Sequence, residues 1–311
     1  MEQFSHISVL KEEAIEGLAI KPDGIYVDAT LGGAGHASVI LSHLNKLGHL
    51  YCFDQDVYAI NRSTEILKSI DDNFTIINAN FKDIKKELTN RGIHQVDGVL
   101  YDLGVSSFQF DITERGFSYN KDAQLDMRMN QSQVLDAKIL INSYTEQELS
   151  KIFFMYGEEK YARNIARRIV QERSKKEIQT TFELVEVIKK ALPAAVLRKG
   201  SHPAKKVFQA LRIAVNDELR VFETSLQDAL QMLAPQGRIA VITFHSLEDR
   251  IAKTIFREHV EVDIPKGLPI KDSEIKREFE LVNKKVIIPS EEEIANNNRS
   301  RSAKLRVIKK L

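Results

Sequence analysis

The residues best suited to chemistry stand around a glycine-rich turn, residues 27–36, which reads V-D-A-T-L-G-G-A-G-H. An apolar segment reaches Asp28, passes through Gly32, Gly33 and Gly35, and continues into a helical pattern. Glycines at a strand-to-helix turn let the backbone approach a ligand, and the N–H groups at the helix start face that ligand. The turn therefore predicts a site for a nucleoside-containing cofactor, in preference to a turn that only packs a helix on a sheet.

A second acid, Asp54, follows the next apolar segment, about one strand–helix–strand unit further along the chain. An acid in that position holds ribose hydroxyls in nucleotide-binding folds. A dinucleotide site prefers G-x-G-x-x-G, but Gly35 is followed three residues later by Ser38. Asp28 would also repel a pyrophosphate, whereas the cationic sulfonium cofactor S-adenosylmethionine would tolerate that acid. The pattern favours methyl transfer over hydride transfer, and an NAD-linked oxidoreductase remains the alternative.

A third acid, Asp102, ends another apolar run and opens the segment D-L-G-V-S-S-F-Q at residues 102–109. In open α/β sheets, ligands bind just beyond the carboxyl ends of the strands. We therefore expect Asp102 to face cofactor and substrate, with Ser106, Ser107 and Gln109 as hydrogen-bonding neighbours. The alternative for Asp102 is a helix cap.

A further polar segment, T-F-H-S-L-E-D-R at residues 243–250, ends a later apolar run in the same layer. Ser246, with Asp249 three positions later, is predicted to cap the helix that follows. His245 is a candidate pocket residue whose role the sequence leaves open.

The elements that position these residues alternate between strands and helices. Strands are predicted at Ile25–Ala29, Leu50–Phe53, Phe74–Asn78, Val96–Tyr101 and Arg238–Phe244. Helices are predicted between the first four, at Ala37–Leu47, Ala59–Ile70 and Ile84–Arg91. Such alternation predicts a parallel sheet covered by helices.

The gap before the fifth strand is helical, with patterns at Thr145–Phe154, Lys160–Arg173 and Phe182–Ala191. It predicts a helical domain inserted between the fourth and fifth strands. One long helix is predicted over Ala204–Leu233, and strands Glu280–Ile288 and Ala303–Lys309 are predicted to pair at the sheet edge. The expected division is 1–108 and 204–311 for the sheet domain and 109–203 for the insertion.

Composition narrows the class of protein. The 311 residues contain 45 Lys and Arg against 44 Asp and Glu, so net charge indicates no particular partner. The single cysteine, Cys52, excludes an intramolecular disulfide framework and fits a reducing cytoplasm. No apolar run approaches the roughly 20 residues that span a bilayer, and the first residues lack a signal-peptide pattern. We expect a cytoplasmic protein with no membrane partner.

Several motifs together resemble one family. The chain is similar to the bacterial 16S rRNA cytosine-N4 methyltransferases, the RsmH or MraW family, in order and over nearly its whole length. The matching segments are H-I-S-V-L (6–10), G-I-Y-V-D-A-T-L-G-G-A-G-H (24–36), D-L-G-V-S-S-F-Q (102–109), E-R-G-F-S (114–118), L-D-M-R-M (125–129), Y-G-E-E-K-Y-A (156–162), H-P-A-K-K-V-F-Q-A-L-R-I-A-V-N-D-E-L (202–219) and F-H-S-L-E-D-R (244–250).

The resemblance implies a class I, Rossmann-like methyltransferase sheet with an inserted helical domain for substrate recognition. It implies S-adenosylmethionine as cofactor, no metal, and methylation of N4 of a decoding-region cytidine in 16S rRNA (cytosine-1402 in conventional rRNA numbering), within the 30S subunit. Ala34 departs from the family's usual glycine in the G-G-H triplet, which weakens close backbone approach only slightly. Carried over by motif, the cofactor contacts are Ala34, Gly35, His36, Asp54, Phe81, Asp102 and Gln109.

The reaction makes Asp102 the candidate catalytic residue, because a cytosine N4 amine is a poor nucleophile that must be positioned and must lose a proton. Many exocyclic-amine methyltransferases have Asp/Asn-Pro-Pro-aromatic after this strand, whereas this chain has Asp102-Leu103-Gly104-Val105. We expect a positioning or cofactor-contacting carboxylate there. Methylation at C5 needs a cysteine nucleophile, and Cys52 lies within a predicted strand.

Two basic clusters predict contacts with RNA phosphates. They contain Lys160, Arg163, Arg167 and Arg168, and Lys205 and Lys206. A solvated helix face is the alternative for either cluster alone. We expect the target cytosine to be extruded into a cleft between sheet and insertion. A non-catalytic RNA-binding or ribosome-assembly factor is the rival class.

Overall fold

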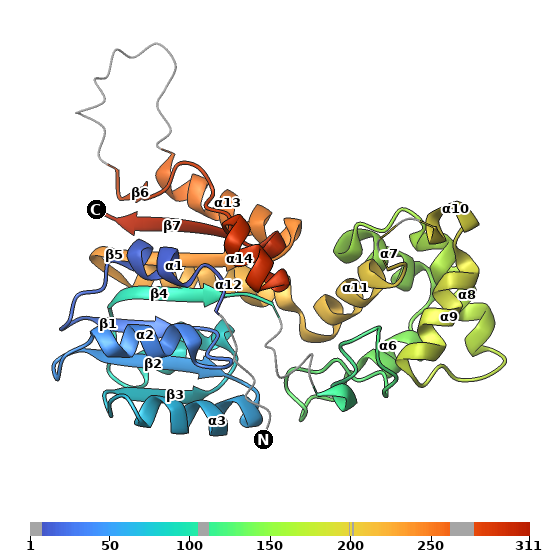
Figure 1. Ribbon diagram of the computed structural model, residues 1–311, viewed down its shortest axis with the longest axis horizontal. Helices are drawn as coiled ribbons and strands as arrows, with labels where there is room; N and C mark the ends of the chain where they lie inside the picture. The colour runs from blue at the N-terminus through green and yellow to red at the C-terminus, as the bar shows by residue number, and fades with distance from the viewer. Residues whose placement is uncertain (1–7, 105–111, 199, 201, 262–276) are drawn as a thin grey trace, which may run out of the picture. The chain divides into compact units, whose positions relative to one another are not determined.

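A computed structural model describes residues 8–104, 112–198, 200, 202–261 and 277–311 (Figure 1). Its described residues form a seven-stranded sheet of order β3-β2-β1-β4-β5-β7-β6. The strands are β1 (Ile25–Asp28), β2 (His49–Asp54), β3 (Phe74–Asn78), β4 (Val96–Asp102), β5 (Leu233–Thr243), β6 (Phe279–Leu281) and β7 (Lys304–Lys310). The first five strands pair with one another in parallel, and β7 is antiparallel to β5 and β6. The prediction of a Rossmann-like α/β sheet, parallel over its first five strands and covered by helices, is confirmed.

Each face of the sheet is covered by helices, because neighbouring residues of a strand point to opposite faces. On one face, Tyr26 and Cys52 join a core with the first three helices. On the other face, Val27 and Phe53 join a core with three later helices. The first layer is α1 (Lys11–Leu18), α2 (Gly35–His43) and α3 (Val57–Lys68), and the second is α4 (Ile84–Thr89), α12 (Glu218–Met232) and α13 (Ser246–Val260).

The chain divides into two compact units, residues 1–104 with 219–311 and residues 105–218. The second unit is helical and has an apolar core of its own, centred on residues such as Phe153, Ile165 and Leu211. Its helices are α6 (Ala137–Ser143), α7 (Glu146–Gly157), α8 (Ala162–Arg173), α9 (Thr181–Ala191), α10 (Ala194–Leu197) and α11 (Lys205–Asn216).

The predicted helix over 204–233 is wrong, because the structure breaks it at Asp217. This residue adopts φ 51° and ψ 35°, the left-handed region, and separates α11 from α12. Aspartate tolerates that conformation. The helical period of the apolar residues continues on both sides of Asp217, so the sequence pattern does not reveal the break. Since α11 packs on α7, residues 204–218 belong to the helical unit rather than to the sheet unit.

The C-terminal strands pair at the sheet edge as expected, but β6 ends at Leu281 and not at residue 288. The side chain of Asn283 ends the ladder: its Oδ1 accepts from Val307 N at 2.7 Å and its Nδ2 donates to Leu305 O at 3.2 Å. The connection to β7 then contains α14 (Glu291–Asn296) and the 3₁₀ helix η4 (Asn298–Ser302).

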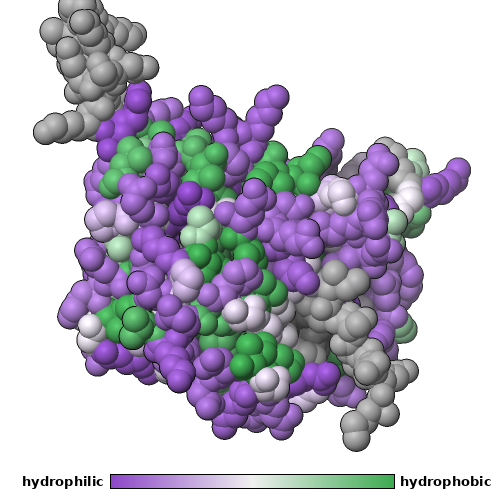
Figure 2. All heavy atoms as spheres, turned by 60° about the vertical axis from the view of Figure 1, so that its left-hand side comes forward, coloured by the Kyte–Doolittle hydropathy of each residue, from purple (hydrophilic) through white to green (hydrophobic). Residues whose placement is uncertain are grey.

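The face of the molecule drawn in Figure 2 is mainly hydrophilic. Figure 2 shows one face on which hydrophobic atoms form separate groups among hydrophilic side chains. Among the described residues, none of the helices has the length and apolar character that crossing a membrane would require.

Candidate functional site

Three carboxylates lie at the carboxyl ends of three adjacent parallel strands. Asp54 ends β2, Asp28 ends β1 and Asp102 ends β4, and the sheet order places β1 between the other two. The sequence-based placement of these acids at one edge of the sheet is therefore confirmed. Asp28 is buried, whereas the other two side chains keep partial exposure.

The glycine turn is fixed to the end of β2. Leu31 N donates to Phe53 O at 3.0 Å, and Gly32 N donates to Asp54 Oδ2 at 3.0 Å. The other carboxylate oxygen of Asp54 accepts from Asp56 N at 2.8 Å. Asp54 thus holds the turn against β2 and still has lone pairs for ligand hydroxyls.

Ala34 ends the turn as the N-cap of α2, with φ 60° and ψ 17°. This is the left-handed region, where glycine is the unstrained residue. The side chain is fully buried, so its methyl group has a packing role that a glycine would lack. The following N–H groups, including those of Gly35 and His36, open α2 and have no acceptor within the helix. They form a suitable site for an anionic ligand group.

His36 connects the third carboxylate to the N-terminal segment. Its Nδ1 lies 3.4 Å from Asp102 Oδ2, and its Nε2 donates to Val9 O at 3.1 Å. The ring is 4% exposed. Burial would lower the pKa of His36, but the hydrogen bond and charge of Asp102, the charge of Asp28 and the Val9 carbonyl outweigh it, so the pKa is raised. The structure therefore favours an imidazolium beside Asp102.

Sequence reasoning assigned His36 to the cofactor and missed its bonds to Asp102 and Val9. The partners lie 66 and 27 positions away along the chain (102 minus 36, and 36 minus 9), so no local pattern indicates them. Only the strand order, which places β4 beside β1, could have suggested the first contact.

Asp102 has one oxygen available for a ligand. Its Oδ2 faces His36, whereas its Oδ1 is buried and has no hydrogen-bond partner among the described residues. Its N–H donates to Thr30 Oγ1 at 2.7 Å, and Thr30 N donates to Asp28 Oδ1 at 2.9 Å. A buried carboxylate oxygen without a donor is costly, so the residues present fit a ligand that supplies N–H groups or positive charge.

Burial raises the pKa of two carboxyls at this edge. The pKa of Asp28 rises to about 6, since desolvation and the Asp102 charge outweigh the Thr30 N–H and the His36 charge. The pKa of Asp54 also rises to about 6, because desolvation exceeds the effect of its backbone donors. Both groups therefore keep their charge less strongly than ordinary carboxyls do, and a cation bound there would favour the charged forms.

Two predicted cofactor residues remain, of which the structure describes Phe81 but not Gln109. Phe81 starts the 3₁₀ helix η1 (Phe81–Asp83) and contacts Tyr101 edge-on, with ring centroids 5.8 Å apart. It is partly buried against the sheet core, so its ring has a packing role as well as free surface. Gln109, with Ser106 and Ser107, lies outside the described residues. Cys52 is a buried free thiol whose pKa burial raises well above the usual value, consistent with an unreactive residue.

The prediction for residues 245–249 is corrected by the structure. The N-cap of α13 is His245, whose side chain accepts from Glu248 N, and the carboxylate of Glu248 returns to Phe244 N at 2.8 Å. The capping box thus starts one residue before Ser246. Asp249 is instead engaged by Lys304 at 3.0 Å and Arg306 at 2.8 Å. In the sequence, His245 precedes Glu248 by three residues and Ser246 precedes Asp249 by three residues, so either could be the cap. The end of β5 at Thr243 decides between them.

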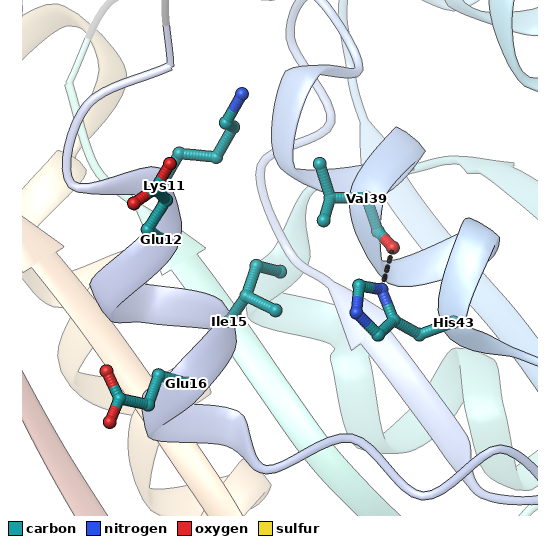
Figure 3. Close-up of a pocket in the computed structure, with 6 residues that line it drawn as sticks. All are labelled: Lys11, Glu12, Ile15, Glu16, Val39 and His43. Carbon is teal, nitrogen blue, oxygen red and sulfur yellow. Dashed lines mark hydrogen bonds between the residues drawn. The ribbon is translucent and has the colours of Figure 1, made fainter.

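A shallow pocket of about 400 Å³ lies elsewhere, between α1 and α2 (Figure 3). Ile15 and Val39 extend into it from the two helices, and His43 Nδ1 is bonded to Val39 O at 2.8 Å. None of the predicted site residues lines this pocket, so we do not assign the cofactor to it.

All six predicted RNA-binding residues lie in the helical unit. Lys160 and Arg163 are exposed and form no ion pair within the described part of the chain. Arg167 lies 3.6 Å from Glu146 and Arg168 lies 3.4 Å from Glu172. At the start of α11, Lys205 and Lys206 are exposed, and Lys206 Nζ donates to Glu158 O at 2.8 Å. The cluster on α8 is therefore partly neutralised by acids of its own unit.

Comparison with known proteins identifies relatives along the full chain. A family model described as the MraW methylase family matches residues 3–311. A curated relative from Streptococcus dysgalactiae subsp. equisimilis, named ribosomal RNA small subunit methyltransferase H, is 55% identical over 312 aligned positions, which cover 100% of this chain and 99% of the relative.

Solved structures also align along the chain. An rRNA methylase from Streptococcus thermophilus matches with a TM-score of 0.45 and 12% identity, covering 99% of both chains. A Streptococcus mutans protein in complex with SAH matches with a TM-score of 0.45 and 15% identity, covering 98% of this chain and all of the other.

Proposed function

Because the chain belongs to the MraW methylase family, we propose that it methylates N4 of the decoding-region cytidine of 16S rRNA, with S-adenosylmethionine as methyl donor. The observation that supports this most strongly is the 55% identity to a ribosomal RNA small subunit methyltransferase H across the full length of both chains. The proposed compartment is the cytoplasm, where the substrate is made.

The chemistry of the strand-end acids supports the proposed cofactor. S-adenosylmethionine carries a sulfonium and an ammonium, and its electrophilic methyl group is transferred to N4 while N4 loses a proton. Asp28 and Asp102, whose Oδ1 has no partner within the part of the chain that the structure describes, supply negative charge in a partly desolvated site, where attraction to a cation is stronger than in water. The residues proposed to hold the cofactor are Ala34, Gly35, His36, Asp54, Phe81, Asp102 and Gln109.

Asp102 is the residue proposed to act on the substrate. Its Oδ1 has no hydrogen-bond partner among the described residues, while its Oδ2 is oriented by His36. An N4–H bonded to this oxygen would hold the amine in a fixed direction, and orientation of this kind lowers the barrier of a two-substrate reaction substantially. The negative charge of the carboxylate would also stabilise the positive charge that develops on N4 during methyl transfer.

The site residues Lys160, Arg163, Arg167, Arg168, Lys205 and Lys206 are proposed to bind RNA phosphates. Exposed Lys160, Arg163 and Lys205 support this most directly, because no carboxylate within the described residues competes for them. The insertion thereby serves substrate recognition, and the sheet unit serves catalysis.

The deciding experiment measures methyl transfer from labelled S-adenosylmethionine to naked 16S rRNA and to 30S subunits isolated from a strain lacking the gene. We expect label in 30S particles, and mass spectrometry of the rRNA should locate N4-methylcytidine at the proposed nucleotide. Unchanged N4-methylcytidine in the deletion strain would contradict the assignment.

The same assay separates the enzyme from a non-catalytic RNA-binding factor. A binding module would retain affinity for the particle and incorporate no label. We expect Asp102→Ala to lose turnover, whereas Asp54→Ala should mainly weaken cofactor binding. Full turnover in the Asp102 variant would remove that residue from the mechanism.

A further inference from the structure

A basic turn stands at the same edge of the sheet unit as the three carboxylates. Strand β7 runs antiparallel to β5, with Lys304 paired with Thr243, while Ile242 of β5 pairs with Asp102 of β4. The residues immediately before Lys304 therefore emerge at the carboxyl ends of β4 and β5. They form η4 (Asn298–Ser302) and include Arg299 and Arg301.

The turn is held rigidly by its own backbone and by one buried side chain. Asn297 caps it, with Oδ1 accepting from Arg299 N at 3.2 Å. Ser300 is fully buried, its Oγ donates to Asn297 O at 2.8 Å, and its carbonyl accepts from Ala303 N at 2.7 Å. Because Ser300 points inward, its two arginine neighbours are both exposed.

The turn is also connected to the N-terminal segment that contacts His36. Leu10 N donates to Glu293 Oε1 of α14 at 2.9 Å, and the adjacent Val9 carbonyl accepts from His36. The helix that leads into η4 is thus anchored beside the residues that orient Asp102. This second attachment fixes the turn relative to the proposed site.

The charges near the turn are distributed unevenly. The next two basic residues, Lys304 and Arg306, are both neutralised by Asp249. Arg301, in contrast, forms no ion pair within the described residues. The acids of α14 stand in its first turn, and one of them, Glu293, is engaged by Leu10. Positive charge therefore remains exposed at η4 itself.

We propose that Arg299 and Arg301 form a phosphate-binding surface for the RNA strand that carries the target nucleotide. The proposal rests on the proposed function and extends the RNA contacts from the helical unit to the sheet unit. Two interstrand spacings, roughly 10 Å, separate β7 from β4, so β7 begins about that far from the strand that ends at Asp102. Contacts of this kind position the strand without reading its sequence.

The test compares Arg301→Gln with the wild-type protein in binding to 30S subunits at several salt concentrations, without methyl donor. Loss of one phosphate contact should lower the slope of log affinity against log salt by about 0.7 for a single strand. We also expect KM for the particle to rise several-fold while S-adenosylmethionine affinity stays unchanged. Arg301→Lys, which keeps the charge, should restore most of the slope.

Lys46→Gln is the matched control, because Lys46 is exposed in the loop before β2, at the opposite edge of the sheet. It should leave the slope and KM unchanged. A slope in Arg301→Gln equal to that of the wild type and of the control would overturn the proposal. The binding readout needs no methyl transfer, so a wild-type protein that binds with the expected slope but transfers no methyl group contradicts the proposed function alone.

Discussion

A buried carboxylate at the end of β1 makes the stability of this protein depend on pH in the opposite direction from an ordinary paired acid. The pKa of Asp28 is about 6 in the folded protein, against 3.8 for a free side chain. Between these values the folded state binds a proton that the unfolded state does not, so the free energy of unfolding falls as pH rises through that window. About two pKa units correspond to at most about 3 kcal/mol.

We therefore expect Asp28→Asn to stabilise the protein without cofactor, and to do so more at pH 7.5 than at pH 4.5. Asparagine keeps an oxygen for the Thr30 N–H and does not titrate. Part of the gain is offset because His36 loses a favourable charge. Denaturant titrations at the two pH values measure the difference, with Asp23→Asn on the exposed turn before β1 as control. Equal stabilisation at both pH values would contradict the burial argument.

Ala34 tests how much of the glycine turn depends on backbone freedom. Its left-handed conformation costs roughly 1–2 kcal/mol for a residue with a Cβ, but glycine would lose a buried methyl worth about 0.8 kcal/mol and add chain entropy to the unfolded state. These terms nearly cancel, so we expect Ala34→Gly to change unfolding free energy by less than about 1 kcal/mol. Ala34→Val, with a β-branched side chain, should destabilise by more than about 2 kcal/mol. Thermal melts measure the stability of both variants, and calorimetry measures their binding of S-adenosylmethionine. Strong stabilisation by Ala34→Gly would contradict this expectation.

At the scale of single residues, sequence reasoning found acids where strands end and missed what connects them. Asp28, Asp54 and Asp102 could be predicted because each follows an apolar run, and parallel strands end at one edge. The link from Thr30 to both Asp28 and Asp102, and the bond from His36 to Val9, depend on side-chain directions across different strands. No spacing along the chain contains that information.

At the scale of elements, the cap of α13 illustrates a choice that local patterns leave open. His245 and Ser246 both precede an acid by three residues, and the structure uses His245 with Glu248. We expect His245→Ala to destabilise the protein by about 1 kcal/mol, and His245→Asn, a good cap residue, to recover most of that loss. Chemical denaturation measures both. If His245→Ala instead abolished S-adenosylmethionine binding with unchanged stability, His245 would be a pocket residue.

The first four strands were predicted to within one residue at each end, because their apolar runs are separated by turn residues. Helix α1 and the first five residues of β5 were not predicted. Two further errors have a common cause. Asp217 breaks a helix by adopting a left-handed conformation, and Asn283 ends a strand by substituting its side chain for the backbone. Each is a single polar residue within an apolar period that continues on both sides, so the period alone cannot reveal it.

At the scale of the whole molecule, the chain folds into two units, and what distinguishes its basic residues is whether an acid pairs with them. Net charge is +1, yet exposed basic residues with no acidic partner among the described residues occur in both units. In the helical unit, Lys175 and Lys176 are paired with Glu172 and Glu183, whereas Lys160 and Arg163 are not paired within the described residues. A count of basic residues in the sequence treats all four residues alike. Only the structure shows which of them are paired with acids.

This difference yields a matched comparison of two double variants. Removing the charges of Lys160 and Arg163 together, as Lys160→Gln with Arg163→Gln, should lower the salt slope of RNA binding by about 1.4, the value for two single-strand phosphate contacts. Removing those of Lys175 and Lys176 should lower it much less, because each charge is already engaged by a carboxylate. S-adenosylmethionine affinity should be unchanged in both variants, since the strand-end acids lie in the other unit. Binding of 30S subunits at graded salt measures the slopes. Equal losses in the two variants would show that non-local charge, rather than contact with phosphates, governs binding by this unit.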